Sequence, residues 1–183
     1  ESRYETDLKL LPEGNDPAAF VKALQDVELA TLTDDYWAKT LPLELSTSAS
    51  RGPSLFAYYA ALVLRDAKAL FSKGKVADLL DPPAIGKKKP LERHHLFPKR
   101  YLHKVGITEL RETNQIANFA LVEWDDNIAI SDVPPKDYWL KYAERFSDEE
   151  LKAMMHWHAL PEGWQDMDYH DFLVARRPMI ANV

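Results

Sequence analysis

The segment Leu55–Leu64 constrains the fold most, because it is apolar almost all the way round when it is drawn as a helix. Pro53 comes shortly before it and fits the first turn of a helix, which does not need every backbone N–H. A helix that is hydrophobic on every side must be covered by other elements. We therefore predict a core helix here. Hydrophobic residues make up 46% of the chain, which is enough for such a core.

Most of the remaining sequence is also typical of helices. Asp16 and Pro17 form a helix start signal, and apolar residues follow them at near-helical spacing. The segment "TDDYWAKTLP" predicts a short helix that ends at Pro42, and "VADLL" predicts another. Ser147 is a predicted N-cap because acidic residues follow it directly. A final helix is predicted from "DYHDFLVARRPMI".

The pattern changes after residues 81–90, "DPPAIGKKKP", whose composition is typical of a linker. "LERHHLF" then predicts a strand end, and "QIANFALVEW" predicts a second strand. "DNIAISDVPPKDYWLKYAERF" begins as a turn or short helix, breaks at Pro134 and Pro135, and continues as a helix. We therefore expect a mostly α (α+β) fold, in which a helical domain encloses a small insert with a two-stranded hairpin. The predicted parts are a helical subdomain (1–86), the insert (87–146) and C-terminal helices (147–183).

Charge is unevenly distributed along the chain. The formal net charge is -6, which by itself argues against a general nucleic-acid binder. Between residues 87 and 104, however, Glu92 is the sole acidic residue among many basic ones: Lys87, Lys88, Lys89, Arg93, Lys99, Arg100 and Lys104. Such a run is commonly a solvated loop. Because this one surrounds a pair of histidines, we predict that it binds phosphate groups, with Arg93, Lys99 and Arg100 nearest the site.

The histidine pair is His94–His95. A neutral imidazole binds divalent metal ions, and it also accepts a proton near neutral pH. Neighbouring side chains on a regular strand point to opposite faces, so the pair can serve one site only at a strand end or a bulge. Pro98 indicates such an end. The alternative is that both are ordinary polar residues, which is the assignment that we give to the other histidines.

Two asparagines favour the catalytic interpretation. Asn118 lies among apolar residues in "IANFAL", where a buried amide needs hydrogen-bond partners. Asn127 follows the second predicted strand in "WDDNIAI", and its carbonyl oxygen can complete the shell of a hard divalent ion. The alternatives are a turn or strand-edge position for Asn118 and a helix N-cap for Asn127.

Together, "ERHHLFPKRYL" and "NQIANFALVEWDDNIAISDVPPKDYW" resemble the HNH (ββα-metal) nuclease domain of the GmrSD-type family of modification-dependent restriction and phage-defence proteins. The resemblance covers residues 90–138, and the helical segment before them is similar to what precedes this domain in the family. By matching position, it implies that His94 and Asn127 bind a divalent metal ion. His95 stands at the general base, and Asn118 stands at the central asparagine that fixes the loop.

The same resemblance implies further details of the site. The spacing of Glu92, His94 and His95 is similar to that of the nuclease colicins, and it implies that Glu92 or a backbone carbonyl fixes the tautomer of His95. The first metal ligand is often acidic in HNH sites, whereas His94 is neutral. A neutral ligand shifts the preference towards Mn²⁺, Ni²⁺ or Zn²⁺ relative to Mg²⁺. The chain has no cysteines for a zinc knuckle, so packing of the flanking helices must hold the site.

The predicted function is that of a metal-dependent DNA endonuclease that nicks one strand, acting in restriction or anti-phage defence. A double-strand break would need two nicks or a dimer. The sequence does not begin with Met, so we expect an N-terminal partner domain in a longer polypeptide. Two alternatives stay open, a catalytically inactive DNA-binding or regulatory module and an RNA-cleaving nuclease. The absence of cysteine, of a membrane-length apolar run and of a glycine-rich nucleotide loop predicts a cytoplasmic protein that is not itself an NTPase.

Overall fold

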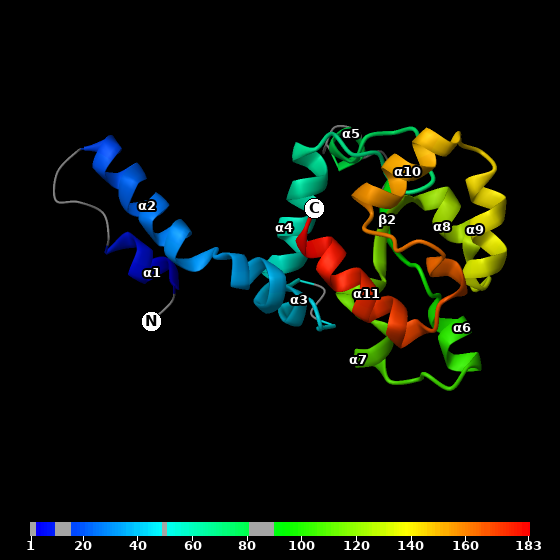
Figure 1. Cartoon of the computed structure of the whole chain (residues 1–183). Helices are drawn as coiled ribbons and strands as arrows, with labels where there is room; N and C mark the ends of the chain where they lie inside the picture. The colour runs from blue at the N-terminus through cyan, green and yellow to red at the C-terminus, as the bar shows by residue number, and fades with distance from the viewer. Residues whose placement is uncertain (1–2, 10–15, 49–50, 81–89) are drawn as a thin grey trace. The chain divides into compact units, whose positions relative to one another are not determined.

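The computed structural model describes residues 3–9, 16–48, 51–80 and 90–183 (Figure 1). The chain divides into two compact units, residues 1–40 and residues 41–183. The predicted insert and the predicted C-terminal helices fall in the same unit, and the three-part division at residues 86 and 146 stays a prediction. Among the described helices, none combines the length and the apolar character that a membrane span requires.

The described residues of the smaller unit form α1 (Arg3–Leu8), α2 (Pro17–Thr31) and the π-helical segment η1 (Tyr36–Thr40). α2 begins where the sequence predicts. The Asp16 carboxylate accepts hydrogen bonds from the backbone N–H groups of Ala18 and Ala19, at 3.0 and 3.2 Å. These bonds satisfy donors that have no partner inside the helix, so the start signal read from Asp16 and Pro17 is confirmed.

The predicted helix end at Pro42 is wrong. A new helix, α3 (Leu41–Glu44), begins one residue earlier and contains Pro42 in its first turn. Proline is tolerated there because the backbone N–H groups of a first turn have no partner within the helix. A proline in the interior of a helix would disrupt it, but Pro42 lies in the first turn of α3, where it does not.

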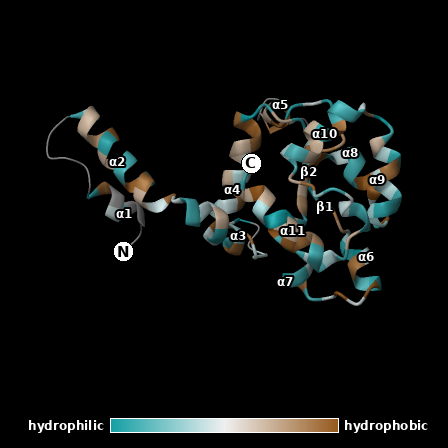
Figure 2. Ribbon diagram, viewed as in Figure 1, coloured by the Kyte–Doolittle hydropathy of each residue, from teal (hydrophilic) through white to brown (hydrophobic). Residues whose placement is uncertain are grey.

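The predicted core helix forms α4 (Pro53–Leu64), but only one face of it is buried. Leu55, Tyr58 and Leu62 are at most 5% exposed, whereas Phe56 is 57% and Leu64 is 86% exposed. Figure 2 shows hydrophobic to near-neutral colours along this helix. The prediction of burial all round is therefore wrong, because the composition of a helix does not determine how many neighbours cover it.

The larger unit contains most of the helices. After α3 and α4 come α5 (Val76–Leu80), α6 (Lys99–Lys104), α7 (Leu110–Thr113), η3 (Ile116–Asn118), α8 (Trp124–Ile130), α9 (Pro135–Ala143), α10 (Asp148–Trp157), η4 (Trp164–Asp166) and α11 (Tyr169–Ala181). The predicted cap of α10 is confirmed, because the Ser147 hydroxyl accepts from the N–H of Glu150 and the Glu150 carboxylate accepts from the N–H of Ser147. Asp168 caps α11 by accepting from the N–H of His170 at 2.8 Å.

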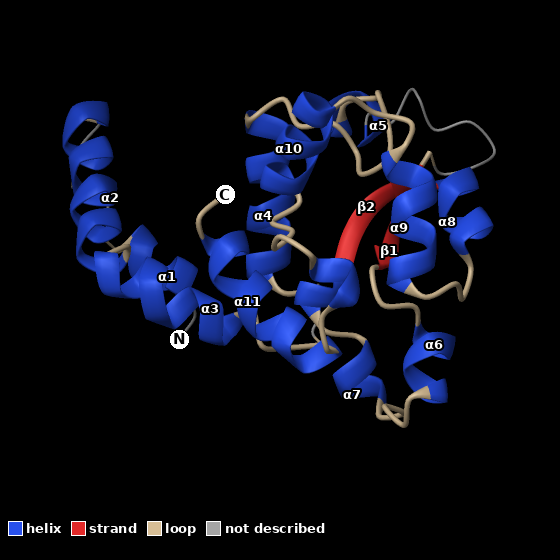
Figure 3. Cartoon of the chain, turned by 45° about the vertical axis from the view of Figure 1, so that its right-hand side comes forward, coloured by secondary structure: helices blue, strands red, loops and turns tan. Residues whose placement is uncertain are grey.

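Two strands, β1 (Leu91–His95) and β2 (Phe119–Glu123), form a small antiparallel sheet. The predicted mostly helical chain with a two-stranded sheet is thus confirmed. The strands do not form a tight hairpin, because residues 96–118 connect them and include α6, α7 and η3. Figures 1 and 3 show the sheet between α8 and α9 on one side and α4 and α11 on the other. The sheet is therefore covered by helices of the same unit.

An aromatic cluster fills the core next to the end of β1. The Phe97 ring lies 4.9 Å from the ring of Phe172 and 6.0 Å from that of Trp164, measured between centroids. Trp164 is fully buried, and Phe97 is 2% exposed. Since Phe97 is only two residues after His95, the chain that leaves the histidine pair is anchored directly in the best-packed part of the molecule.

Arg176 on α11 is a fully buried cation that the sequence does not reveal. Its Nη1 donates to the carbonyl oxygens of Ala117 and Phe119, at 2.8 and 2.9 Å. Its Nε and Nη2 donate to the carbonyl oxygen of His158, at 3.2 and 2.8 Å. Burial lowers the pKa of Arg176 from its usual value. The side chain therefore fastens α11 to the start of β2 and to the end of α10.

His158 is the most deeply buried histidine of the larger unit, with no exposed surface. Its Nε2 lies 3.0 Å from the carbonyl oxygen of Lys68, so Nε2 carries the proton and donates it. Its Nδ1 is buried without a partner among the described residues. Burial is the main cause that lowers the pKa of His158 to about 4. The folded state therefore favours the neutral ring.

This lowered pKa makes stability depend on pH. In the unfolded chain His158 protonates near its ordinary value of 6.5, whereas in the folded state it does so near 4. Between these values the unfolded state binds more protons, so the free energy of unfolding falls as the pH falls. We expect His158 to contribute roughly 3 kcal/mol to this decrease. In denaturant unfolding at pH 7.5, 5.5 and 4.5, His158→Gln should have a smaller decrease than wild type. His156→Gln, at an exposed position, should match wild type, and equal decreases in both variants would contradict the assignment.

Candidate functional site

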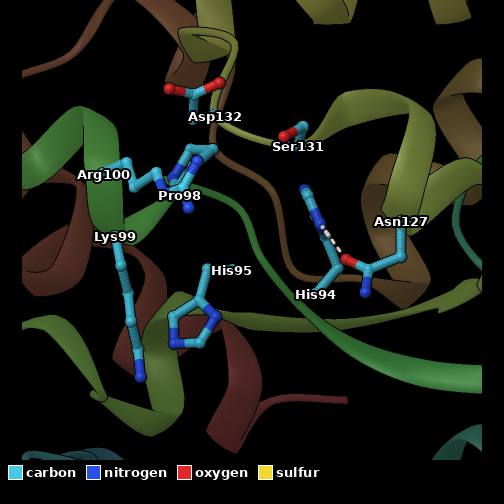
Figure 4. A pocket seen from close by; sticks show the side chains of 8 residues that line it. All are labelled: His94, His95, Pro98, Lys99, Arg100, Asn127, Ser131 and Asp132. Carbon is cyan, nitrogen blue, oxygen red and sulfur yellow. Dashed lines mark hydrogen bonds between the residues drawn. The ribbon is translucent and has the colours of Figure 1, made fainter.

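A pocket of about 210 Å³ lies where the end of β1, the start of α6 and the end of α8 meet (Figure 4). Its lining consists of His94, His95, Pro98, Lys99, Arg100, Asn127, Ser131 and Asp132. The structure thus brings together both predicted histidines, one predicted asparagine and two predicted phosphate-binding residues. Ser131 and Asp132 were not predicted. Ser131 has a φ of 53°, which is uncommon for a residue other than glycine and gives the chain a sharp turn beside the pocket.

Both histidines reach the pocket because β1 ends at His95. The pairing is regular up to that residue, with His94 opposite Ala120 and His95 opposite Phe119. Beyond it the chain turns through Pro98 into α6, so the pocket surrounds the end of the strand and not one face of it. This agrees with the strand end that the sequence predicts.

A chain of hydrogen bonds runs from His94 through Asn127 to Glu92. Nδ1 of His94 lies 2.8 Å from Oδ1 of Asn127, and Nδ2 of Asn127 donates to Oε2 of Glu92 at 2.7 Å. A carboxylate accepts hydrogen bonds and does not donate them, so Glu92 turns the amide until its oxygen faces His94. Nδ1 of His94 consequently carries the proton. Its Nε2 is left with a lone pair, and this atom is buried without a partner among the described residues.

The surroundings of His94 keep its ring neutral. The side chain is 2% exposed, and its edge packs against the ring of Tyr138, with 5.7 Å between centroids. Tyr138 is itself fixed, because its hydroxyl donates to the carbonyl oxygen of Leu96 at 2.6 Å. Burial lowers the pKa of His94 to about 4, although the hydrogen bond with Asn127 acts in the opposite direction. A neutral imidazole is the form that binds metal ions.

His95 is also held neutral, by different neighbours. Its Nε2 lies 2.9 Å from Oδ1 of Asn114, and its ring packs edge-on against Phe119 with 4.8 Å between centroids. Burial lowers the pKa of His95 to about 4, and the positive charges of Lys99 and Arg93 lower it further, against the effect of the Asn114 bond. A neutral ring is the form that can accept a proton. Asn114 opens the segment "NQIANFALVEWDDNIAISDVPPKDYW", but neither the strand pattern nor the resemblance assigned it a role, so its contact with His95 was not predicted.

Asn118 is the last residue of the segment that connects the two strands, and its side chain holds this segment together. Its side chain has no exposed surface. Its Oδ1 accepts from the backbone N–H of Phe97 at 2.8 Å, and its Nδ2 donates to the carbonyl oxygens of Phe97 and Thr113, both at 3.1 Å. The buried amide thus has the partners that the sequence argument required. The geometry suits the loop-fixing position that the resemblance implies for Asn118.

Two expectations about polar side chains need correction. Glu92 bonds to Asn127, and among the described residues no contact of it with His95 is present; residues 92 and 95 are three apart on a strand and point to opposite faces. The N-cap alternative for Asn127 is wrong, because this residue lies inside α8 and Glu123 occupies the cap position. Glu92 therefore orients the His94 side of the pocket.

The basic residues do not form one surface. Lys99 and Arg100 line the pocket, whereas Arg93 lies over the ring of Phe119 and lines a separate groove with Phe56 and Tyr59. Lys104 is paired at 3.1 Å with Asp132. Lys87, Lys88 and Lys89 lie outside the described residues. Asp132 comes from beyond α8 and adds negative charge that reading residues 87–104 alone could not reveal.

The described residues of the pocket supply few ligand atoms for a divalent cation, so most positions around an ion would be open to water or substrate. Among the described residues, no group of three or more His, Asp and Glu side chains converges on a metal position. Nδ1 of His94 carries the proton and donates to Oδ1 of Asn127 at 2.8 Å, so Nδ1 has no lone pair for an ion in this arrangement. The atom of His94 that could bind an ion is Nε2, which is buried without a partner among the described residues.

The remaining histidines stay outside the pocket. His103 on α6 and His156 on α10 are exposed, and His158 is buried elsewhere in the core, which fits their assignment to surface or core. We compared the chain with protein-family models, with curated proteins and with solved structures. No family model, no curated protein and no solved structure matches it.

Proposed function

We propose that the chain carries an HNH-type, metal-dependent endonuclease site that nicks DNA. The observation that carries this proposal is the succession β1, β2 and α8, in which β1 and α8 line one pocket with the two histidines at the end of β1 and Asn127 on α8. Asn118 is the last residue of η3, directly before β2, where it holds the connecting segment. The proposed role in restriction or anti-phage defence rests on the sequence resemblance.

Each of these residues has its own role in the proposed reaction. His95 accepts a proton from a water molecule, whose oxygen then attacks the phosphorus of the DNA backbone while the bond to the 3′ oxygen breaks. His94 would hold the divalent ion through Nε2, and Asn127 would join it once the hydrogen bond between Asn127 and Nδ1 of His94 opens; the ion would supply charge stabilisation for the phosphate and the leaving oxygen. Lys99 and Arg100 bind neighbouring phosphates, which gives affinity without reading the bases. Glu92 keeps Asn127 in the orientation that serves His94.

The first test of this proposal is metal dependence. Supercoiled plasmid should convert to the open circle when the protein is incubated with Mn²⁺, Mg²⁺, Ni²⁺ or Zn²⁺, and excess EDTA should stop the conversion. A parallel incubation with RNA separates a DNA endonuclease from an RNA-cleaving nuclease. A preparation of His95→Ala, purified identically, controls for contaminating nucleases. Nicking that continues at the same rate in excess EDTA would contradict a metal-dependent site.

The second test concerns phosphate binding. Replacing Lys99 and Arg100 together with glutamine should weaken binding to all DNA sequences alike, and it should reduce the slope of log affinity against log salt by roughly one to two. The control is the double replacement of Lys136 and Lys141 on α9, which are exposed and remove the same charge away from the pocket. Equal salt slopes in the two double variants would show that neither Lys99 nor Arg100 contacts phosphate.

A further inference from the structure

His95 has a hydrogen-bond partner that comes from a different part of the chain. Oδ1 of Asn114 lies 2.9 Å from Nε2 of His95. An amide oxygen accepts hydrogen bonds, so this contact requires that Nε2 carries the proton of the neutral ring. The other ring nitrogen, Nδ1, then holds the lone pair, and it has no hydrogen-bond partner among the described residues. In the view of Figure 4, one ring nitrogen of His95 lies on the side of Lys99 and the other on the side of His94 and Asn127.

Hydrogen bonds of Asn114 and of its two neighbours in sequence fix the position of its backbone. Its backbone N–H donates to the carbonyl oxygen of Leu110 at 3.0 Å, which places it at the C-terminal end of α7. The residue before it, Thr113, is fully buried, and its carbonyl oxygen accepts from the Asn118 amide at 3.1 Å. The residue after it, Gln115, accepts a hydrogen bond from Arg177 on α11 at 3.2 Å. Each neighbour of Asn114 is thus tied to a different element, so the position of its side-chain oxygen is set before substrate binds.

Asn118 links the segment that contains Asn114 to the segment that contains His95. Asn118 bonds to Thr113 on one side and to Phe97 on the other, and Phe97 follows His95 by two residues. The Asn118 side chain therefore holds the segments of His95 and Asn114 together, and we call this hydrogen-bonded arrangement of Phe97, Thr113 and Asn118 the frame. Such preorganisation is what a proton acceptor needs, because a ring that rotates or changes tautomer presents an N–H where a lone pair is required.

From this geometry, and resting on the proposed endonuclease function, we infer that Asn114 is a positioning residue for the general base. It holds His95 in the tautomer with a proton on Nε2, so that Nδ1 is the atom that takes the proton from the attacking water. Asn114 itself touches neither substrate nor metal. Its role is distinct from that of Glu92, which orients Asn127 and through it His94.

The test uses NMR of the full chain with ¹⁵N-labelled histidine. Two-bond ¹⁵N–¹H correlation spectra at neutral pH identify which ring nitrogen of each histidine carries the proton, and His95→Gln identifies the His95 signals. Wild type should show His95 protonated at Nε2. Asn114→Leu is close in size but has no acceptor, so it should lose this preference. Asn114→Asp keeps an oxygen acceptor and should retain it, and the signals of exposed His103 should not change in either variant.

Nicking kinetics complete the test. Asn114→Leu should lower kcat about 10–100-fold, with KM for DNA and metal affinity unchanged, and Asn114→Asp should recover most of the rate. If Asn114→Leu unfolds, Asn114→Ala removes the acceptor with less bulk and takes its place. Two results would overturn this inference and leave the proposed function standing. One is that His95 keeps its tautomer in Asn114→Leu, and the other is that its tautomer changes while kcat does not. If the wild-type chain nicks DNA with none of the metal ions, the proposed function is overturned, and so is the catalytic role inferred for Asn114. The NMR spectra would still show whether Asn114 fixes the tautomer of His95.

Discussion

We expect the replacement of His95 with alanine to lower the rate of the proposed nicking reaction by at least about 10²–10⁴-fold while metal affinity stays at the wild-type level. The reason is that His95 bonds to Asn114 and packs on Phe119, and it makes no hydrogen bond with the proposed metal-binding pair. The variant should therefore lose the proposed proton acceptor and keep the proposed cation site. Metal binding is measured by calorimetry, nicking by plasmid conversion, and folding by circular dichroism.

The neighbouring variant, His94→Ala, should fail in the opposite way. It removes the partner of Asn127, so metal affinity falls, and residual nicking recovers partly at high metal concentration. Because the His94 side chain is 2% exposed and packs on Tyr138, this variant also loses some stability. His103→Ala, at an exposed histidine on α6, is the matched control and should behave like wild type. His95→Ala cleaving at the wild-type rate, or the same defect in both variants, would contradict the division of roles.

Asn118→Ala should lower the free energy of unfolding by about 2–5 kcal/mol. The substitution removes three hydrogen bonds at a fully buried position. It leaves the backbone N–H and carbonyl of Phe97 and the carbonyl of Thr113 without this partner, and water cannot easily reach them. Nicking should be lost as well, because the frame that places His95 and Asn114 opens.

The measurement is urea unfolding followed by fluorescence of the buried tryptophans. Asn182→Ala provides the control, since it makes the same chemical change at an exposed position after α11, and its effect should stay within about 0.5 kcal/mol. Asn118→Asp should also destabilise, because a carboxylate cannot donate to the two carbonyl oxygens. An Asn118→Ala variant as stable as Asn182→Ala would show that the amide does not hold the connection.

Local patterns predicted the elements that carry the site. The extended character of "QIANFALVEW" led to β2, the capping signal at Ser147 led to α10, and the strand end at His95 explained how two adjacent rings reach one pocket. These features depend on neighbours in sequence, where periodicity and capping chemistry act directly. The buried amide of Asn118 was predictable for a related reason, since an asparagine among apolar residues must find partners.

Contacts between distant segments were not predictable in this way. Asn114 reaches His95 across 19 residues and Asn127 reaches Glu92 across 35, and nothing in the local sequence of either asparagine announces its partner. The exposed side of α4 has the same origin, because apolar composition requires cover only where neighbours are available to provide it. Local sequence thus predicted which elements form, while tertiary packing decided which side chains meet.

The hydrogen bonds of Arg176 have a consequence for the order in which the site matures. This guanidinium holds the carbonyl groups of Ala117 and Phe119, the two residues that flank Asn118. During translation β1, β2 and α8 all leave the ribosome before Arg176 does, so the histidine pair is synthesised well before the side chain that fastens its frame. A nascent chain that ends within α10 would expose both rings without the complete frame that holds His95 in register with Asn114. Because Arg176 lies on α11, the hydrogen bonds around Asn118 are complete only after most of the larger unit has emerged and packed.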